Sequence, residues 1–469
     1  MPPDTPLSGG PHGPTALRPL LDTVLTALAK GAAERGGPLP PGGPAAVAEH
    51  TRRALGAVLP DHGTGAEDAL ARIVRAVALG AADPADPLCA AHLHTPPLAL
   101  AVAADLAASA LNPSLDSWDQ APAASELERL VTGVLAREVY PAAALPDALV
   151  TSGGTESNQL ALLLARERRP DRPLQVVCST GTHHSVRRAA WLLGLPDPLA
   201  VPAANATQVK GGADAGGLDP AALDTALTAL PPGPRLVVAT AGSTDTGRID
   251  PLPALADVCA RHGAELHVDA AYGGAFLFSP AHRALLDGLE RAHSVTLDLH
   301  KLGWQPVAAG LFVVADHSRL APLALTADYL NADDDTDAGL PDLLGRSPRT
   351  TRRPDVLKIA VTLGALGRDG LAALLDRVAE RAQLLADLIE TRPGLELWRR
   401  PTLTTVLFRP EDADDDRVAA IRRALLTEGR AVLGRARADG RLWLKATLLN
   451  PHATPGDLNH LIELVEGTP

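Results

Sequence analysis

The chain has 469 residues, and its 55 acidic residues outnumber its 43 basic ones, which gives a formal net charge of −12. Nucleic-acid and anionic-membrane binders need clustered cations, so this balance argues against both kinds of partner. Hydrophobic residues make up 46% of the chain and charged residues 21%, as in globular proteins with a large buried core. The longest apolar runs, such as residues 98–110, are shorter than a membrane span.

The N-terminus has no basic region followed by an apolar core, so no secretory signal is expected. Cys89, Cys178 and Cys259 are far apart and odd in number, which argues against a disulfide framework and a zinc site. The acidic runs 333–337 and 411–416 lack metal-ligand spacing and are interpreted as solvated loops. We therefore expect a cytoplasmic protein without a bound metal.

The first part of the chain is predicted to be helical. Residues 1–45 are rich in proline and glycine around one helical stretch, 17–29, and are interpreted as a mobile arm or as a helix that awaits a partner surface. Residues 46–135 have a helical pattern that is interrupted at prolines, and no strand is expected among them.

Residues 136–345 are predicted to form a large α/β domain. Short apolar runs alternate with amphipathic stretches, which indicates βαβ units and a mainly parallel sheet. The expected strands are 148–150, 174–178, 235–239, 265–269, 294–297 and 310–314. Functional residues are then expected at the carboxyl ends of these strands.

Residues 346–469 are predicted to form a smaller α+β domain. It should begin with a long helix over 355–390. The strands expected after this helix are 395–398, 404–408, 431–435 and 442–448, with helices between and after them.

The segment Thr151-Ser-Gly-Gly-Thr-Glu-Ser-Asn158 follows a predicted strand and opens a predicted helix, 156–168. Its glycines allow a close backbone approach, Thr155 can cap the helix, and the free N–H groups at a helix start suit a phosphate. The nucleotide patterns G-x-x-x-x-G-K and G-x-G-x-x-G are absent, so the phosphate need not belong to ATP or NAD. Such a turn, taken alone, is more often structural.

Two later strands end in residues that suit chemistry. Asp269 ends the strand of Val268-Asp-Ala-Ala-Tyr-Gly-Gly274, where a buried carboxylate needs a cation or serves as a helix cap. Lys301 ends Ser294-Val-Thr-Leu-Asp-Leu-His-Lys301, and desolvated lysines form Schiff bases. A phosphate cradle, a strand-end aspartate and then a His-Lys pair is the order typical of fold-type I pyridoxal-phosphate enzymes.

With these motifs the sequence resembles the group II pyridoxal-dependent amino-acid decarboxylases over roughly residues 85–465. The resemblance implies a fold-type I enzyme that binds pyridoxal 5′-phosphate. It depends on motifs in family order: Ser117–Glu128, Thr151–Ser157, His183–Val186, Gly242–Thr244, His267–Tyr272, Asp298–Lys301, Tyr329–Asn331, Thr350–Arg353 and Leu449–Pro451.

The resemblance also implies roles for individual residues. Lys301 would be the Schiff-base lysine, Asp269 would pair with the pyridine nitrogen, and His183 would stack on the ring and help to position the substrate carboxylate. Tyr329, on a loop that is mobile in the family, would protonate the carbon left after carbon dioxide departs. The phosphate contacts would come from Gly154, Thr155 and His300, and the further ring contacts from Thr244 and Ala271.

Some of these residues have other interpretations. His183 and His184 could bind a metal, but adjacent side chains point to different sides. His92 and His94 could bind a metal from one strand face, but the prolines that follow them are typical of a loop. Tyr329 could be a packed interface tyrosine.

The substrate is predicted to be a diamino acid of the 2,4-diaminobutyrate, lysine or ornithine type. The strings 118–120, 300–306 and 329–331 most resemble decarboxylases of such substrates, and Asp119 and Gln120 could receive a side-chain ammonium. The alternatives are an aromatic or acidic substrate, an amine-aldehyde synthase, an aminotransferase and a catalytically silent relative. The decarboxylase motif at 118–128 argues against the aminotransferase, and Tyr329 argues against the synthase.

The resemblance implies a homodimer in which the N-terminal helical segment interlocks with its partner and the mobile loop reaches across. A helical segment that is apolar along much of its length is consistent with this arrangement. The other expected partner is the small-molecule amino-acid substrate.

Overall fold

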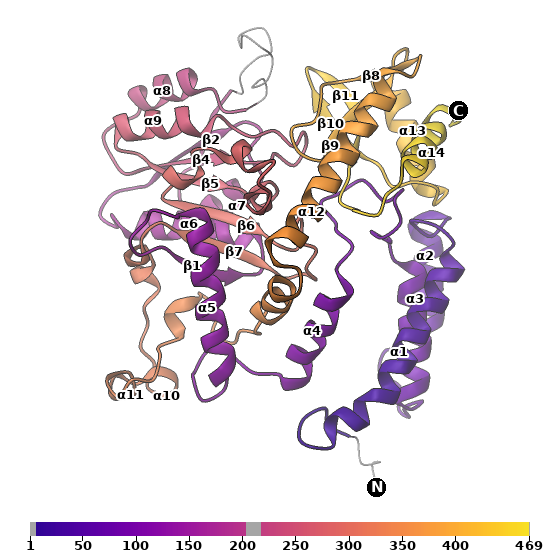
Figure 1. The fold of residues 1–469 in the computed structure, drawn as a ribbon, viewed down its shortest axis with the longest axis horizontal. Helices are drawn as coiled ribbons and strands as arrows, with labels where there is room; N and C mark the ends of the chain where they lie inside the picture. Colours follow the sequence, from indigo (N-terminus) through magenta and orange to yellow (C-terminus); the bar gives the residue numbers. More distant parts are fainter. Residues whose placement is uncertain (1–5, 203–216, 469) are drawn as a thin grey trace. The chain divides into compact units, whose positions relative to one another are not determined.

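The computed structural model describes residues 6–202 and 217–468. The chain forms two compact units, a larger one of Pro97–Arg377 and a smaller one of Met1–Pro96 with Val378–Pro469. Figure 1 shows the ribbon and the element labels. The predicted boundaries at residues 45, 135 and 345 stay predictions. The chain passes between the units inside α12 (Val356–Glu390), which is kinked at Gly367, and not in a loop.

The larger unit contains a seven-stranded sheet in the order β1-β7-β6-β5-β4-β2-β3. The strands are β1 (Asp147–Thr151), β2 (Gln175–Ser179), β3 (Leu199–Val201), β4 (Arg235–Thr240), β5 (Glu265–Asp269), β6 (Ser294–Asp298) and β7 (Gly310–Val314). The pairs β3/β2, β2/β4, β4/β5 and β5/β6 are parallel, whereas β7 is antiparallel to both β1 and β6. The predicted α/β class with a mainly parallel sheet is confirmed.

The larger unit also contains helices. They are α4 (Ala99–Leu111), α5 (Pro122–Val139), α6 (Gly154–Glu167), α7 (Ser185–Leu192), α8 (Pro220–Ala229), α9 (Leu252–His262) and the short α10 (Asp328–Asn331) and α11 (Asp333–Asp337). Several of them, such as α6 and α9, pack on this sheet, whereas α10 and α11 lie away from it (Figure 1). Leu160 and Leu164 of α6 pack with Val176, Val238 and Phe312 in one buried cluster. This burial fixes α6 on the sheet. Since α6 begins directly after β1, its first turn lies near the end of that strand. The acidic run at 333–337, predicted as a loop, is the exposed helix α11.

The smaller unit combines N-terminal helices with a four-stranded antiparallel sheet in the order β10-β11-β9-β8. Its strands are β8 (Leu395–Leu397), β9 (Thr405–Pro410), β10 (Gly434–Ala438) and β11 (Arg441–Thr447). Its helices are α1 (Gly13–Arg35), α2 (Gly43–Leu55), α3 (Ala66–Gly80), α13 (Asp415–Thr427) and α14 (Pro455–Glu466). Ile389, Phe408, Ile421, Leu444 and Ile462 lie in one buried core.

The helical stretch predicted at 17–29 belongs to the longer helix α1, and residues 1–5 of the predicted arm lie outside the described part. Gly31 of α1 lies so near α3 that an added Cβ would be 2.6 Å from Cβ of Ala78. Small residues therefore let the two helices approach closely. Among the described residues, every helix is too short or too polar to span a bilayer.

Candidate active site

A cavity of about 270 Å³ lies in the larger unit, at the carboxyl ends of β1, β4, β5 and β6. This is the edge of a mainly parallel sheet where ligands usually bind. The cavity brings together every predicted site residue except Tyr329: Gly154, Thr155, His183, Thr244, Asp269, Ala271, His300 and Lys301. Asp119 and Gln120, predicted to meet the substrate side chain, do not belong to its described lining.

The glycines at the start of α6 are needed for close packing at one end of the cavity. Gly153 has a φ of 147°, and a Cβ there would lie 2.9 Å from Cε1 of His300. A Cβ on Gly310 would lie 2.4 Å from Cα of Gly153. The absence of side chains at Gly153 and Gly154 therefore lets the backbone at the start of α6 lie close to the cavity. A helix N-terminus of this kind attracts an anion such as a phosphate.

Lys301 and His300 meet at a buried carboxylate beside this cradle. Nζ of Lys301 lies 3.0 Å from Oδ2 of Asp298, and Nε2 of His300 lies 3.5 Å from the same oxygen. The backbone N–H of Ala309 donates to Nδ1 of His300 over 3.2 Å, so Nε2 carries the ring proton. Burial lowers the pKa of His300, which favours its neutral form.

Asp298 was not predicted as a site residue. Its Oδ1 is buried and has no hydrogen-bond partner among the described residues, which leaves an acceptor beside the Lys301 ammonium. Its sequence position could have indicated a site residue, because Asp298 ends a strand three residues before Lys301.

Asp269 is held by two donors. Nδ2 of Asn158 donates to Oδ2 of Asp269 over 2.8 Å, and the backbone N–H of Ala271 donates to Oδ1 over 3.1 Å. Donors of this kind stabilise the charged carboxylate. Asn158 also donates to Oγ of Ser185 over 2.8 Å, and that hydroxyl lies 2.8 Å from Nδ1 of His183. The Ser185 hydroxyl therefore connects His183 to the Asn158 and Asp269 pair.

A fully buried histidine completes this network beneath the cavity. Nε2 of His267 lies 3.0 Å from Oδ1 of Asn158, and Nδ1 lies 2.9 Å from Oγ of Ser294. The hydroxyl of Thr296 donates to the same Asn158 oxygen over 3.1 Å. Burial lowers the pKa of His267 to about 4, so the ring is neutral near pH 7.

Sequence reasoning assigned no role to Asn158, Ser185, His267 or Thr296, although all four stand in the quoted segments. A usable signal was Asn158 itself, because a buried amide inside a helix must find partners. Burial also lowers the pKa of His183, against the opposing effect of the Asp269 charge. Within the described part of the chain, no three His, Cys, Asp or Glu side chains gather in a way that suits a metal.

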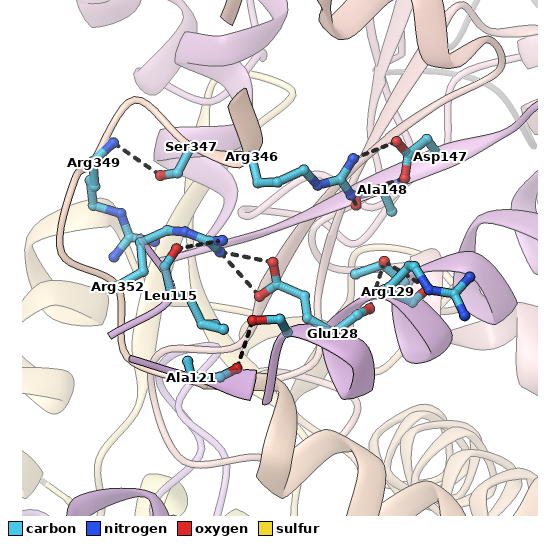
Figure 2. Close-up of polar contacts among 12 residues, drawn as sticks. Leu115, Ala121, Glu128, Arg129, Asp147, Ala148, Arg346, Ser347, Arg349 and Arg352 are labelled. Atoms are coloured by element: carbon cyan, nitrogen blue, oxygen red, sulfur yellow. Dashed lines mark hydrogen bonds and ion pairs between the residues drawn. The ribbon is translucent and has the colours of Figure 1, made fainter. Parts of the chain in front are cut away.

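Tyr329 lies on the short helix α10, and its side chain is 80% exposed. It is not among the described residues that line the cavity. Hydrogen bonds and an ion pair hold the chain that follows Tyr329. Nδ2 of Asn331 donates to Oδ1 of Asp342 over 2.9 Å, and Figure 2 shows Arg346 reaching Asp147 at the start of β1. The single chain therefore does not bring Tyr329 together with the other predicted residues.

Figure 2 also shows a buried ion pair further along this segment. Nη1 of Arg352 donates to both oxygens of the Glu128 carboxylate, over 2.9 and 3.1 Å, and Nη2 donates to the carbonyl of Leu115. Arg352 and Glu128 are each nearly inaccessible to solvent. The pair fixes the chain before α12 against α5, which gives the Thr350–Arg353 motif a structural role.

Comparison with known proteins identifies the family. The pyridoxal-dependent decarboxylase conserved domain matches residues 49–411. The L-2,4-diaminobutyrate decarboxylase of Rhizobium meliloti is 42% identical over 423 residues, which cover 87% of this chain and 83% of the relative. The enzyme of the same name from Acinetobacter baumannii is 31% identical over 437 residues, which cover 86% and 84%.

A solved structure agrees with these sequence matches. It is the glutamate decarboxylase domain of diaminobutyrate-pyruvate transaminase and L-2,4-diaminobutyrate decarboxylase from Vibrio parahaemolyticus. The likeness has a TM-score of 0.85 at 32% identity and covers 98% of this chain and 96% of that one.

The residues around the cavity fit pyridoxal 5′-phosphate, the cofactor of this family. The glycine cradle at the start of α6 suits its phosphate, Lys301 offers an amine, and Asp269 offers a carboxylate that Asn158 holds in place. The matched conserved domain covers well over half of the chain. The chain therefore belongs to the pyridoxal-dependent decarboxylases, enzymes that release carbon dioxide from amino acids.

Proposed function

We propose that this enzyme converts an L-diamino acid, L-2,4-diaminobutyrate above all, to the amine and carbon dioxide. The observation that carries the proposal is the 42% identity to a diaminobutyrate decarboxylase over most of both chains, together with a cavity that unites Lys301, Asp269 and His183. Aromatic or acidic substrates are the second candidate, because cysteine sulfinic acid decarboxylases also match at 35% identity over a shorter region.

The cavity residues have distinct proposed roles. Lys301 would bind the cofactor aldehyde, and Asp298, 3.0 Å from its Nζ, holds that amine in place. Gly154, Thr155 and His300 would hold the phosphate, while Thr244 and Ala271 would contact the ring. His183, which Ser185 orients, would position the substrate carboxylate. Decarboxylation needs the bond to be broken held in one orientation, which is the role proposed for His183.

Asp269 would pair with the ring nitrogen of the cofactor, and Asn158 holds the Asp269 carboxylate in place. The cofactor, when bound, would supply an electron sink for the pair released with carbon dioxide. A neutral His267 behind Asn158 holds the amide in the orientation that donates to Asp269.

We also propose that the enzyme is a cytoplasmic homodimer in which Tyr329 serves the partner's cavity. Support comes from the 80% exposure of Tyr329 on α10, outside the cavity lining of its own chain. The hydroxyl would give a proton to the carbon that has lost carbon dioxide. The three cysteines are free thiols, which suits a reducing compartment.

The test is to incubate the purified protein with pyridoxal phosphate and, separately, with L-2,4-diaminobutyrate, ornithine, lysine, glutamate, tyrosine and tryptophan. The expected product is 1,3-diaminopropane from diaminobutyrate, about 44 mass units lighter than its substrate. Lys301→Ala should lose this activity, and Lys30→Ala, changed on the smaller unit's helix α1, should keep it. Turnover of glutamate or tyrosine with diaminobutyrate untouched would favour the second candidate.

A further inference from the structure

A second cavity of the larger unit, of about 590 Å³, lies where β4, β5 and β6 begin. The candidate active site lies at the other ends of the same strands. β5, for example, starts at Glu265 beside this cavity and ends at Asp269 beside the first. Six arginines line the second cavity: Arg168, Arg169, Arg172, Arg235, Arg291 and Arg319.

Carboxylates neutralise only part of this positive charge. Glu265 is the single acidic residue in the cavity's described lining, and it pairs with both Arg168 and Arg319 over 2.8 Å. Arg291 pairs with Asp257 over 2.7 Å. One carboxylate shared by two arginines leaves an excess positive charge.

The other three arginines are less well satisfied. Nε of Arg172 lies 3.8 Å from Asp171, at the limit of an ion pair, and both side chains are well exposed. Arg235 donates from Nη2 to the carbonyl of Leu230 over 2.9 Å, while its Nε is buried without a hydrogen-bond partner among the described residues. Within that described part of the chain, Arg169 makes no ion pair. An unpaired buried N–H is costly, so a ligand acceptor at Arg235 would lower the free energy of the site.

The remaining lining leaves room for a ligand and adds a neutral donor. Small residues occupy one wall, including Gly233, Ala260 and Gly263. The backbone N–H of Leu266 donates to Nδ1 of His293 over 3.0 Å, so Nε2 of that ring carries the proton. Burial lowers the pKa of His293, which keeps the ring neutral and able to donate.

We propose that this cavity binds a small multivalent oxyanion, one that carries at least two phosphate or carboxylate groups. Guanidinium groups bind both kinds of group through paired hydrogen bonds. The cluster is not a result of overall composition, because the chain carries a net charge of −12. α6 and α9 both end at this cavity, and the carbonyl groups at their C-termini repel an anion. Each helix end acts as only about half a negative charge, which the arginines outweigh.

The site is tested on the cofactor-loaded enzyme, whose own phosphate site is then filled. Inorganic pyrophosphate and citrate are titrated separately by calorimetry at constant ionic strength, because salt screens such contacts. We expect one site per chain with a Kd at or below about 1 mM for at least one probe. Binding of pyrophosphate alone assigns a phosphate ligand, and binding of citrate alone assigns a carboxylate ligand.

Variants place the binding in this cavity. R169A/R172A changes two exposed side chains and should weaken binding about tenfold or more. R129A/R187A removes two exposed arginines of the same unit that do not line the cavity, and it should bind as the wild type does. Hydrogen exchange of the unmodified enzyme should show probe-dependent protection at 168–172 and 233–235.

The proposal is overturned if neither probe binds, if R169A/R172A binds as tightly as the wild type, or if R129A/R187A is weakened equally. Protection confined to other segments would also overturn it. None of these outcomes depends on which amino acid the enzyme decarboxylates.

Discussion

Asn158 donates a hydrogen bond from Nδ2 to Oδ2 of Asp269 over 2.8 Å. The amide comes from the buried face of α6 and the carboxylate from the end of β5. Because the Asn158 carbonyl oxygen is occupied by His267 and Thr296, the amide cannot rotate without breaking several contacts. The orientation of Asp269 therefore depends on residues that do not line the cavity themselves.

Replacing Asn158 with alanine should weaken both folding and cofactor binding. The change leaves Asp269 Oδ2 without its Asn158 donor and removes the Asn158 contact of His267 Nε2, at about 1–3 kcal/mol for each unsatisfied group. Denaturant unfolding and titration with pyridoxal phosphate measure the two effects. Asn459→Ala, a change of a half-buried asparagine of α14, is the matched control. Wild-type stability and cofactor affinity in Asn158→Ala would show that the contact is unimportant.

His267 should make stability depend on pH between about 4 and 6.5. Its pKa in the folded chain is about 4, below the ordinary value of 6.5, so in this range the unfolded chain binds more protons. Stability therefore rises with pH across the window, by up to about 3 kcal/mol for this one group. Asp250, whose pKa is raised to about 6 by burial, contributes with the opposite sign.

The contribution of His267 is isolated by comparison with His267→Gln. Asp250 is present in both proteins, so its effect cancels in the difference. Denaturant unfolding of both proteins from pH 7.5 to pH 5 should show a steeper loss of stability in the wild type. Parallel curves would mean that His267 titrates normally in the folded chain.

Gly310→Ala should disturb the cradle at the start of α6. The new Cβ would lie 2.4 Å from Cα of Gly153 and 2.5 Å from Oγ1 of Thr151, which forces the two strands apart. We expect a loss of about 1–3 kcal/mol in stability and weaker cofactor binding. Gly364→Ala is the control, because nothing lies within 4 Å of a Cβ at that helical position. If both variants bind the cofactor equally well, the cradle tolerates the shift.

Tyr329→Phe should leave folding unchanged, because the side chain is 80% exposed. The proposed role is proton donation after carbon dioxide leaves, so the amine yield should fall and aldehyde should appear. Product ratios measured by mass spectrometry in air decide this. An unchanged amine yield would remove Tyr329 from the reaction.

The strands of the larger unit were predictable because each is a short apolar run between turn residues. β3 was missed because it has three residues, two of them exposed, and so lacks an apolar run. The antiparallel direction of β7 could not be predicted from composition, since a buried strand has the same pattern in either direction. Its direction matters here, because it brings Gly310 against Gly153.

The cavity residues were predictable for the same topological reason: Asp269 and Lys301 each follow a buried strand, and parallel strands end at one edge. The contacts of Asn158 and His267 were not, because they join residues 109 positions apart in sequence. The position of Tyr329 outside the cavity could not be predicted either, since a motif gives the identity of a residue but not its place in the fold. The helix at 13–35 was predicted over the shorter range 17–29, but its packing was not, because that packing depends on α3 and not on the composition of the helix itself.

The most direct test of the proposed reaction uses L-2,4-diaminobutyrate labelled with carbon-13 in its carboxyl group. The cofactor-loaded enzyme should release labelled carbon dioxide and 1,3-diaminopropane in equal amounts, and Lys301→Ala should release neither. Failure to release label from this substrate, with release from carboxyl-labelled glutamate or tyrosine under the same conditions, would contradict the assignment to a diamino acid.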